Sequence, residues 1–219
     1  MYGAVMDNDQ ETQYRSILAR AEEASARPAI EDQDHDALYW QLHDLAEAHY
    51  EPAIPFFERC LYNTNARWRE DAIRLLGFHY LDYLRGNADL FNHLRYMLIE
   101  DPSSDVRITA AMLLRDAKED TDFPDWALLR ALEEDPVIQV RGRAFESLLT
   151  QTGVSYEVLR QTMRRIDHEE IDATPSLLKQ LIEEHGLDLP TEELTVPFRV
   201  RHPLYPRTDQ DIPPSTKGR

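Results

Sequence analysis

Histidines are the residues of this chain most able to do chemistry, because imidazole binds metal ions and transfers protons near neutral pH. There are eight of them, and His35, His43 and His49 fall on one predicted helix, with His79 further along. A helical zinc motif places two histidines four residues apart, with a third ligand nearby. No two histidines here have that spacing, although His43 and Glu47 do. We therefore predict no metal site and no cofactor.

Carboxylates and the cysteine do not form a catalytic pattern either. Acid–base catalysis needs two carboxylates in different environments. Pairs such as Glu133 and Glu134 have the pattern of an ordinary solvent-exposed helix face, and nothing in the sequence indicates that their environments differ. The single cysteine, Cys60, lies in an apolar run, which favours a buried thiol over a nucleophile. Phosphate-binding glycine loops and nucleophile-elbow motifs are missing from the sequence. These features predict a protein that is not an enzyme.

The charge balance restricts the partners. The 219 residues include 41 acidic and 24 basic ones, a formal net charge of −17. Nucleic acids and anionic membranes are recognised through Lys and Arg, so we expect neither as a partner. A protein with a basic surface fits this charge better. The sequence has no apolar stretch of about 20 residues and no signal-peptide pattern, and we predict a cytoplasmic protein.

An internal repeat is the strongest pattern in the sequence. The segments 98–110 and 132–144 align without gaps, sharing Leu, Glu, Asp-Pro, Val-Arg and Ala at the same offsets. A looser copy has Trp68-Arg69 in place of Val-Arg and Asn63-Thr64-Asn65 in place of Asp-Pro. The Asp-Pro dipeptide predicts the end of one helix and the first turn of the next. The apolar positions after it recur at helical spacing, which predicts one buried helix face.

This unit, Leu-x-x-Asp-Pro-x-x-x-Val-Arg-x-x-Ala-x-x-x-Leu, resembles the HEAT repeat over about residues 48–186. The resemblance implies pairs of antiparallel helices that stack into a curved solenoid with the second helices on its concave side. It also maps the family's inter-helix aspartate onto Asp101 and Asp135, and its helix arginine onto Arg69, Arg107 and Arg141. Tetratricopeptide repeats have a similar period, but their Trp, Gly and Tyr signature is missing at repeat spacing. We expect the arginines to pair with inter-helix aspartates in a ladder, in preference to lining a binding groove.

The predicted fold class is therefore all-α, an α-α superhelix in the form of a short HEAT-like solenoid with an extended proline-rich C-terminal tail. Residues 1–50 form an N-terminal helical pair that caps the array, residues 51–188 form the repeats, and residues 189–219 form an extended or disordered tail. Gly86, Gly153 and Gly186 are expected as left-handed residues just past helix ends. The expected helices span residues 10–26, 34–50, 52–61, 67–84, 88–100, 104–117, 124–134, 137–150, 155–166 and 175–185.

The predicted binding surface is the outer stripe of the second helices, which the HEAT resemblance places on the concave face. Its positions recur at the repeat spacing and carry mixed charge with one methionine, which suits a protein partner. Simple solvent contact is the alternative interpretation. The candidate protein-binding residues are Arg67, Asp71, Arg74, Asp105, Thr109, Met112, Gln139, Arg143 and Glu146.

The leading functional hypothesis is a non-enzymatic protein-binding module, a cytoplasmic adaptor or inhibitor that uses this concave face. One concrete form is an immunity protein that neutralises a basic toxin, since its negative charge would steer the encounter. The alternative is a small-ligand-handling protein that resembles HEAT-like bilin lyases, with Trp40, Phe78 and Tyr83 lining a pigment site. A resemblance to HEAT-like DNA glycosylases would require a basic concave face, which the net charge disfavours.

Overall fold

The computed structural model describes residues 8–27, 32–116, 124–187 and 189–194, and every regular element in these ranges is helical. The prediction of an all-α chain is confirmed for this part. The α-helices are α1 (Asn8–Ser25), α2 (Asp32–Glu47), α3 (Ile54–Cys60), α4 (Ala66–His79), α5 (Leu81–Arg85), α6 (Ala88–Glu100), α7 (Ser104–Asp116), α8 (Trp126–Glu134), α9 (Ile138–Gln151), α10 (Tyr156–Asp167) and α11 (Pro175–Glu184). Short 3-10 helices precede α3 and follow α11, η1 (Glu51–Ala53) and η2 (Glu192–Leu194).

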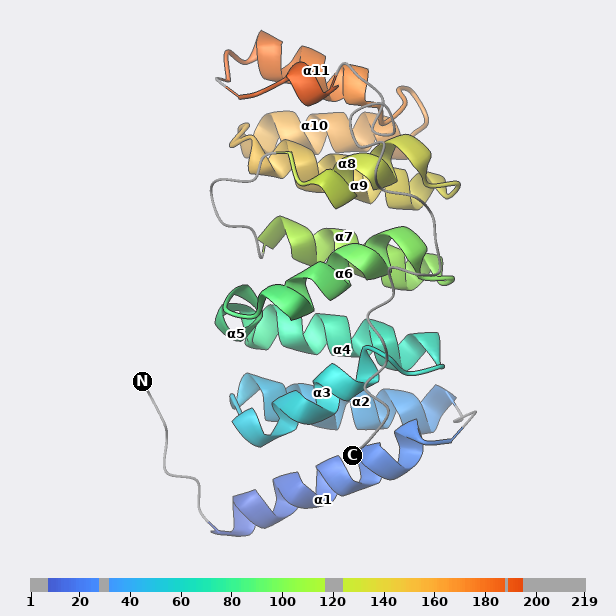
Figure 1. Cartoon of the computed structure of the whole chain (residues 1–219), viewed down its shortest axis with the longest axis vertical. Coiled ribbons are helices and arrows are strands. Elements are labelled where there is room, and N and C mark those ends of the chain that lie inside the picture. The colour runs from blue at the N-terminus through green and yellow to red at the C-terminus, as the bar shows by residue number, and fades with distance from the viewer. Residues whose placement is uncertain (1–7, 28–31, 117–123, 188, 195–219) are drawn as a thin grey trace.

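The helices are stacked in layers along the long axis of the molecule (Figure 1). One row consists of α2, α4, α7 and α9, each packed on the next, with α11 packed on α9. We call these five the second helices. On their other side, α3, α6 and α8 each pack against the second helix that follows in the chain, and α5 joins α4 to α6.

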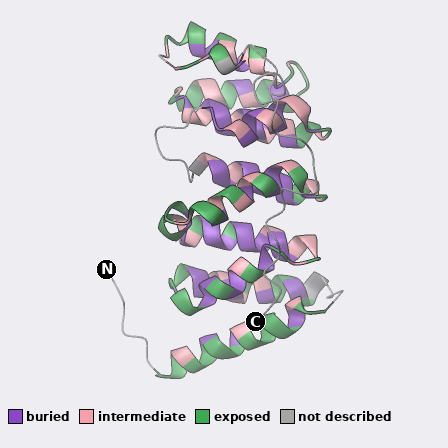
Figure 2. Cartoon of the chain, viewed as in Figure 1, coloured by how far each residue is buried: buried purple, intermediate pink, exposed green. Residues whose placement is uncertain are grey.

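The core lies between these rows, where buried residues gather on the helix faces turned toward their neighbours (Figure 2). The predicted apolar repeat positions are all in it. Val106, Ala110 and Leu114 of α7 are fully buried, and so are the matching residues of α9, Val140, Ala144 and Leu148. Small alanines at one position of each unit let the helix backbones approach closely.

The turns before α4, α7 and α9 share the same kind of hydrogen bond. The carboxylate of Asp101 accepts the Ser103 N–H at 2.9 Å, and the carboxylate of Asp135 accepts the Val137 N–H at 2.8 Å. In the first unit the amide oxygen of Asn63 accepts the Asn65 N–H at 2.8 Å. An Asx side chain that bonds two residues ahead mimics a backbone turn. Asn63 therefore replaces the aspartate of the later units without changing the turn.

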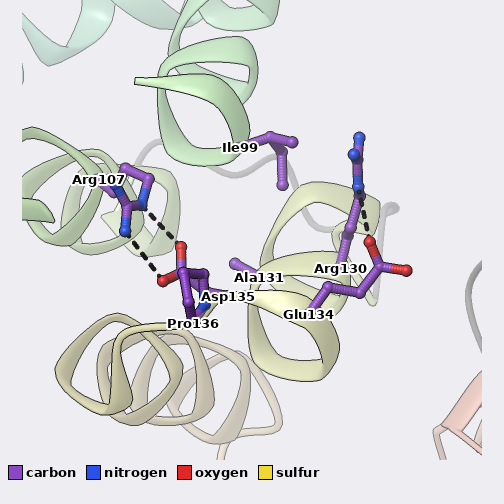
Figure 3. Close-up of a pocket in the computed structure, with 7 residues that line it drawn as sticks. All are labelled: Ile99, Arg107, Arg130, Ala131, Glu134, Asp135 and Pro136. Atoms are coloured by element: carbon purple, nitrogen blue, oxygen red, sulfur yellow. Dashed lines mark hydrogen bonds and ion pairs between the residues drawn. The ribbon is translucent and has the colours of Figure 1, made fainter. Parts of the chain in front are cut away.

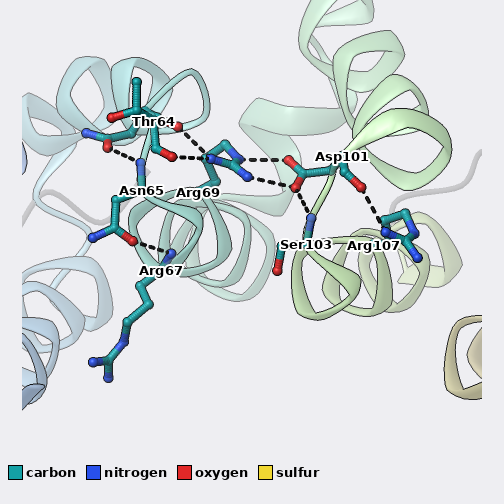
Figure 4. A network of polar contacts seen from close by, with 8 residues as sticks. Thr64, Asn65, Arg67, Arg69, Asp101, Ser103 and Arg107 are labelled. Atoms are coloured by element: carbon teal, nitrogen blue, oxygen red, sulfur yellow. Dashed lines mark hydrogen bonds and ion pairs between the residues drawn. The ribbon is translucent and has the colours of Figure 1, made fainter. Parts of the chain in front are cut away.

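The expected arginine ladder is formed between these turns (Figure 4). Arg69 donates two hydrogen bonds of 2.7 Å to the carboxylate of Asp101, and one of 2.7 Å to the backbone oxygen of Asn63. Arg107 repeats this arrangement one unit later, with bonds of 2.7 and 3.1 Å to Asp135 and 2.8 Å to the backbone oxygen of Asp101. Each guanidinium thus ties the turn of its own unit to the turn of the next.

The third rung is incomplete. Arg141 donates to the backbone oxygen of Asp135 at 2.8 Å, and among the described residues it has no carboxylate partner. Asp172 stands three residues before α11, as Asp101 and Asp135 stand before α7 and α9, but it is exposed. The ladder therefore ends at α9.

Two expectations about helix ends are wrong. Gly153 and Gly186 have the expected positive φ of 74° and 62°, but Gly86 is right-handed at φ −75°. The second helix of the first unit ends at His79 instead of residue 84, because Tyr80 leaves the helical conformation at φ −126° and ψ 37°. Its buried ring and the hydroxyl bond to the Tyr50 backbone oxygen, 3.1 Å, hold that break. Of the predicted tail, residues 195–219 lie outside the described part.

The ladder predicts unequal effects for two arginines at matching positions. Arg107→Ala leaves the Asp135 carboxylate buried without its cation, and we expect the unfolding free energy to fall by about 3–5 kcal/mol. Arg141→Ala removes one hydrogen bond to a backbone oxygen, and about 1 kcal/mol is expected. Chemical denaturation followed by circular dichroism measures both, and equal losses would show that the carboxylate bridge does not stabilise the array.

Candidate functional site

The predicted stripe lies on α4, α7 and α9, but two of its members are not surface residues. Asp71 is 9% exposed and Thr109 is 5% exposed. They were expected to face solvent, and that expectation is wrong. The cause is packing within the row of second helices, because α2 covers one side of α4 and α7 covers the other. Asp105 and Gln139 are exposed as expected.

The charged members of the stripe are mostly paired within this face. Arg67 donates to the carboxylate of Asp36 on α2 at 2.6 Å. Arg74 pairs with Glu70, and Arg143 pairs with Glu146, each one turn along the same helix. Exposed ion pairs of this kind contribute little stability, about 0–1 kcal/mol. The face therefore carries charges of both signs, and its three arginines are paired with nearby carboxylates.

An apolar hollow of about 320 Å³ opens between three second helices. Three stripe residues, Arg74, Thr109 and Met112, line it, while the remaining six do not. The full lining, drawn from α2, α4 and α7, is Tyr39, Ile73, Arg74, Gly77, Phe78, Thr109, Met112 and Leu113. The spacing of residues in the sequence does not reveal Tyr39, Gly77 and Leu113 as lining residues, because their meeting depends on which helices pack together.

A close helix approach forms the floor of this hollow. A Cβ atom at Gly77 would lie 2.2 Å from Cδ1 and 3.0 Å from Cγ of Leu113. The glycine therefore lets the Leu113 side chain fill the space above α4. Phe78, the next residue, is 60% exposed at the rim, and Trp40 on α2 is 59% exposed. Large exposed aromatic side chains next to an apolar hollow are typical of a contact surface.

A buried polar group lies beneath the same face. The Nε2 atom of His35 is 3.3 Å from Oδ2 of Asp71, and the His35 ring meets the ring of Trp68 edge to face at 4.8 Å. Burial is the main cause that raises the pKa of Asp71 to about 7, and the nearby Glu70 carboxylate adds to it. Asp71 is therefore a structural carboxyl whose proton uptake is coupled to folding.

Another hollow, about 200 Å³, lies beside the ladder (Figure 3). Arg107 and Asp135 line it, and Figure 3 shows them bonded to each other, with Arg130 bonded to Glu134. Its charged groups already satisfy one another within the fold. This hollow is a by-product of the ladder and offers no group suited to chemistry.

The aromatic residues considered for a pigment site do not gather in one place. Phe78 and Tyr83 line an open hollow of about 610 Å³ near the end of α4, and Trp40 lines neither this hollow nor the apolar one. Cys60 is buried as expected, and burial raises the pKa of its thiol to about 12. A thiol with such a pKa is not a nucleophile near neutral pH.

Among the described residues, one group offers three side chains that could hold a metal ion, His43, Asp44 and Glu47 on α2.

Comparison with family models, curated proteins and solved structures gives no match for this chain. Within the described part, no helix combines the length and the apolar character needed to cross a membrane.

The Gly77 contact predicts opposite outcomes for two glycines inside helices. Gly77→Ala should lower the unfolding free energy by about 1–3 kcal/mol, because the whole Leu113 side chain would have to move. Gly142→Ala on α9 places its Cβ 3.9 Å from Ile166, an ordinary contact, so the higher helix propensity of alanine should leave stability unchanged or raise it by up to about 1 kcal/mol. Thermal melts of the two variants test this difference.

The raised pKa of Asp71 predicts a pH-dependent difference between the protein and Asp71→Asn. The folded chain holds this proton up to about pH 7, while an unfolded aspartate loses it near the ordinary value of 3.8. The carboxyl therefore destabilises the fold increasingly as pH rises through that window. The unfolding free energy of Asp71→Asn, minus that of the unchanged protein, should therefore increase as the pH rises from about 4 to 7. The exposed Asp105→Asn serves as the control, and a parallel pH profile for the Asp71 variant would contradict the assignment.

Proposed function

We propose that this chain is a non-enzymatic protein-binding module that captures a basic protein on its row of second helices. The observation that carries the proposal is the apolar hollow between α2, α4 and α7, which is lined by the exposed Phe78. The exposed Trp40 contacts the ring of Tyr39, another residue that lines it. The residues that contribute most to binding at a protein interface are often side chains that fill a pocket on the partner and exclude water from it. The partner would place one apolar side chain in the hollow, against Met112 and Leu113.

Charge supports a basic partner. The formal net charge is −17, and three arginines, Arg69, Arg95 and Arg107, are bonded to buried aspartates. Each of these pairs is neutral, so the net negative charge comes from the other acidic groups and produces a negative field around the molecule. On the α2–α4 part of the face, Asp36 and Glu70 are paired with Arg67 and Arg74, so the argument depends on the net charge of the chain. Such a field accelerates encounter with a cationic surface and weakens as salt increases.

The repeat supports a scaffold role in the form of a short HEAT-like solenoid, with the second helices on the concave side. The same arginine–aspartate bridge joins successive units at their turns. Repeated joints of one kind place the second helices at a regular spacing along one side of the molecule. An adaptor or an inhibitor, such as a cytoplasmic immunity protein for a basic toxin, is the function this arrangement suits. The acidic surface speaks against nucleic acid as the ligand.

Matched surface variants test the proposal. Met112→Glu and Phe78→Glu, made singly, put a charge into the anchor site and should weaken binding of a captured partner at least about tenfold, or 1.4 kcal/mol. Tyr156→Glu on α10 is the control, because this side chain is 75% exposed and does not line the apolar hollow. Affinity for the partner, measured by calorimetry, should also fall as salt rises, with melting temperatures nearly unchanged.

Two outcomes would contradict the concave-face assignment. If both hollow variants bind normally while removal of residues 209–219 abolishes binding, recognition runs through the C-terminal segment. If co-expression with a bilin pathway yields a coloured protein whose pigment is lost in Phe78→Glu, the small-ligand alternative replaces protein binding.

A further inference from the structure

The fold brings together histidines that the sequence keeps far apart. The rings of His43 on α2 and His79 on α4 meet edge to face, with centroids 4.8 Å apart and planes at 89°. Glu47 follows His43 by one helical turn, on the same face of α2. One ligand atom from each of His43, Asp44 and Glu47 lies within 4.8 Å of the other two. His43 therefore belongs to a group of three possible ligands on α2 and also contacts the ring of His79 on α4.

We propose that this place binds a divalent transition-metal ion, and that Zn²⁺ is the best-suited one. The ligands would be His43, Glu47 and His79, with Asp44 or water as the fourth. Two imidazole nitrogens and a carboxylate oxygen form a ligand set that suits Zn²⁺, Co²⁺, Ni²⁺ or Cu²⁺ better than Mg²⁺ or Ca²⁺. The proposal is independent of the partner-binding function.

Zinc–ligand bonds of about 2.0–2.2 Å in a tetrahedron separate the ligand atoms by about 3.3–3.6 Å. The ligand atoms of His43, Asp44 and Glu47 lie within 4.8 Å of one another, so a bound ion requires them to move closer. Asp44 and Glu47 are exposed, and His43 and His79 are half-buried, so rotation of the side chains can draw the ligand atoms together. The helix backbones already hold the two imidazoles in contact.

A bound ion would join α2 to α4, and thereby the N-terminal helix pair to the first repeat. Helix α2 belongs to the N-terminal pair, whereas α4 carries Arg69, the first rung of the ladder. A ligand that binds only the folded chain stabilises it in proportion to the logarithm of its concentration. Zinc should therefore raise the melting temperature.

Calorimetric titration of the full chain with Zn²⁺, free of affinity tags and at about pH 7.5 where imidazole is mainly neutral, tests the site. One ion per chain with micromolar or tighter affinity is expected. Co²⁺ should give the visible absorption of a tetrahedral complex. His43→Ala, His79→Ala and Glu47→Gln should each weaken zinc binding at least about tenfold, or 1.4 kcal/mol. His168→Ala and His185→Ala, which change the exposed histidines that directly follow α10 and α11, should bind as the unchanged protein does.

Three results would overturn the site. These are no zinc binding in the micromolar range, normal binding by Glu47→Gln and His79→Ala, and an equal loss in His185→Ala. Glu47 is exposed, so Glu47→Gln keeps the fold and remains informative if a histidine variant does not fold. Melts in the presence of a chelator establish that the variants match the unchanged protein without metal. Zinc should then raise the melting temperature of the unchanged protein and not that of Glu47→Gln.

Discussion

The bridge between a helix arginine and the aspartate of the next turn is the interaction on which the array depends. Arg69 and Arg107 each bond a carboxylate of the following unit and a backbone oxygen of their own turn. Asp101 and Asp135 use the same carboxylates to close their turns. One pair of side chains therefore fixes a turn and the register between two units together. Buried ion pairs are weak sources of stability because their desolvation is costly, so we assign these bridges chiefly to register.

The bridge positions the candidate binding surface. It holds the N-terminal ends of α4 and α7 together, and the Gly77–Leu113 contact brings the same two helices close further along. The apolar hollow lies between α2 and this fixed pair. Where the bridge is missing, after Arg141, the helices bury less, and α10 has only Thr162 and Ile166 buried among its residues. The more regular part of the array is thus the part that carries the hollow.

Much of the array could be predicted from the sequence because its signals are local. Asp-Pro dipeptides and apolar spacing gave helix bounds within a few residues for α6 to α9, and the shared Asp and Arg positions predicted the ladder. The break at Tyr80 was not predictable, because it depends on a hydrogen bond to Tyr50 thirty residues earlier. The bridge from Arg95 to the buried Asp125, 2.8 Å, was missed for a similar reason, since it occurs once and has no repeat to reveal it.

The candidate surface also has residues that local spacing predicts and residues whose position depends on the packing of neighbouring helices. Helical spacing put Met112 and Arg74 on the outer stripe, and both line the hollow. It could not tell that Asp71 lies under α2, since a stripe position becomes buried only when a neighbouring helix covers it. The spacing of histidines within one helix could not predict the contact between His43 and His79 for the same reason, because His79 lies on the next helix of the row. In a stacked array each surface is composed of side chains from successive units. Spacing within a unit therefore predicts which residues face a groove, and only the packing between units decides which of them meet.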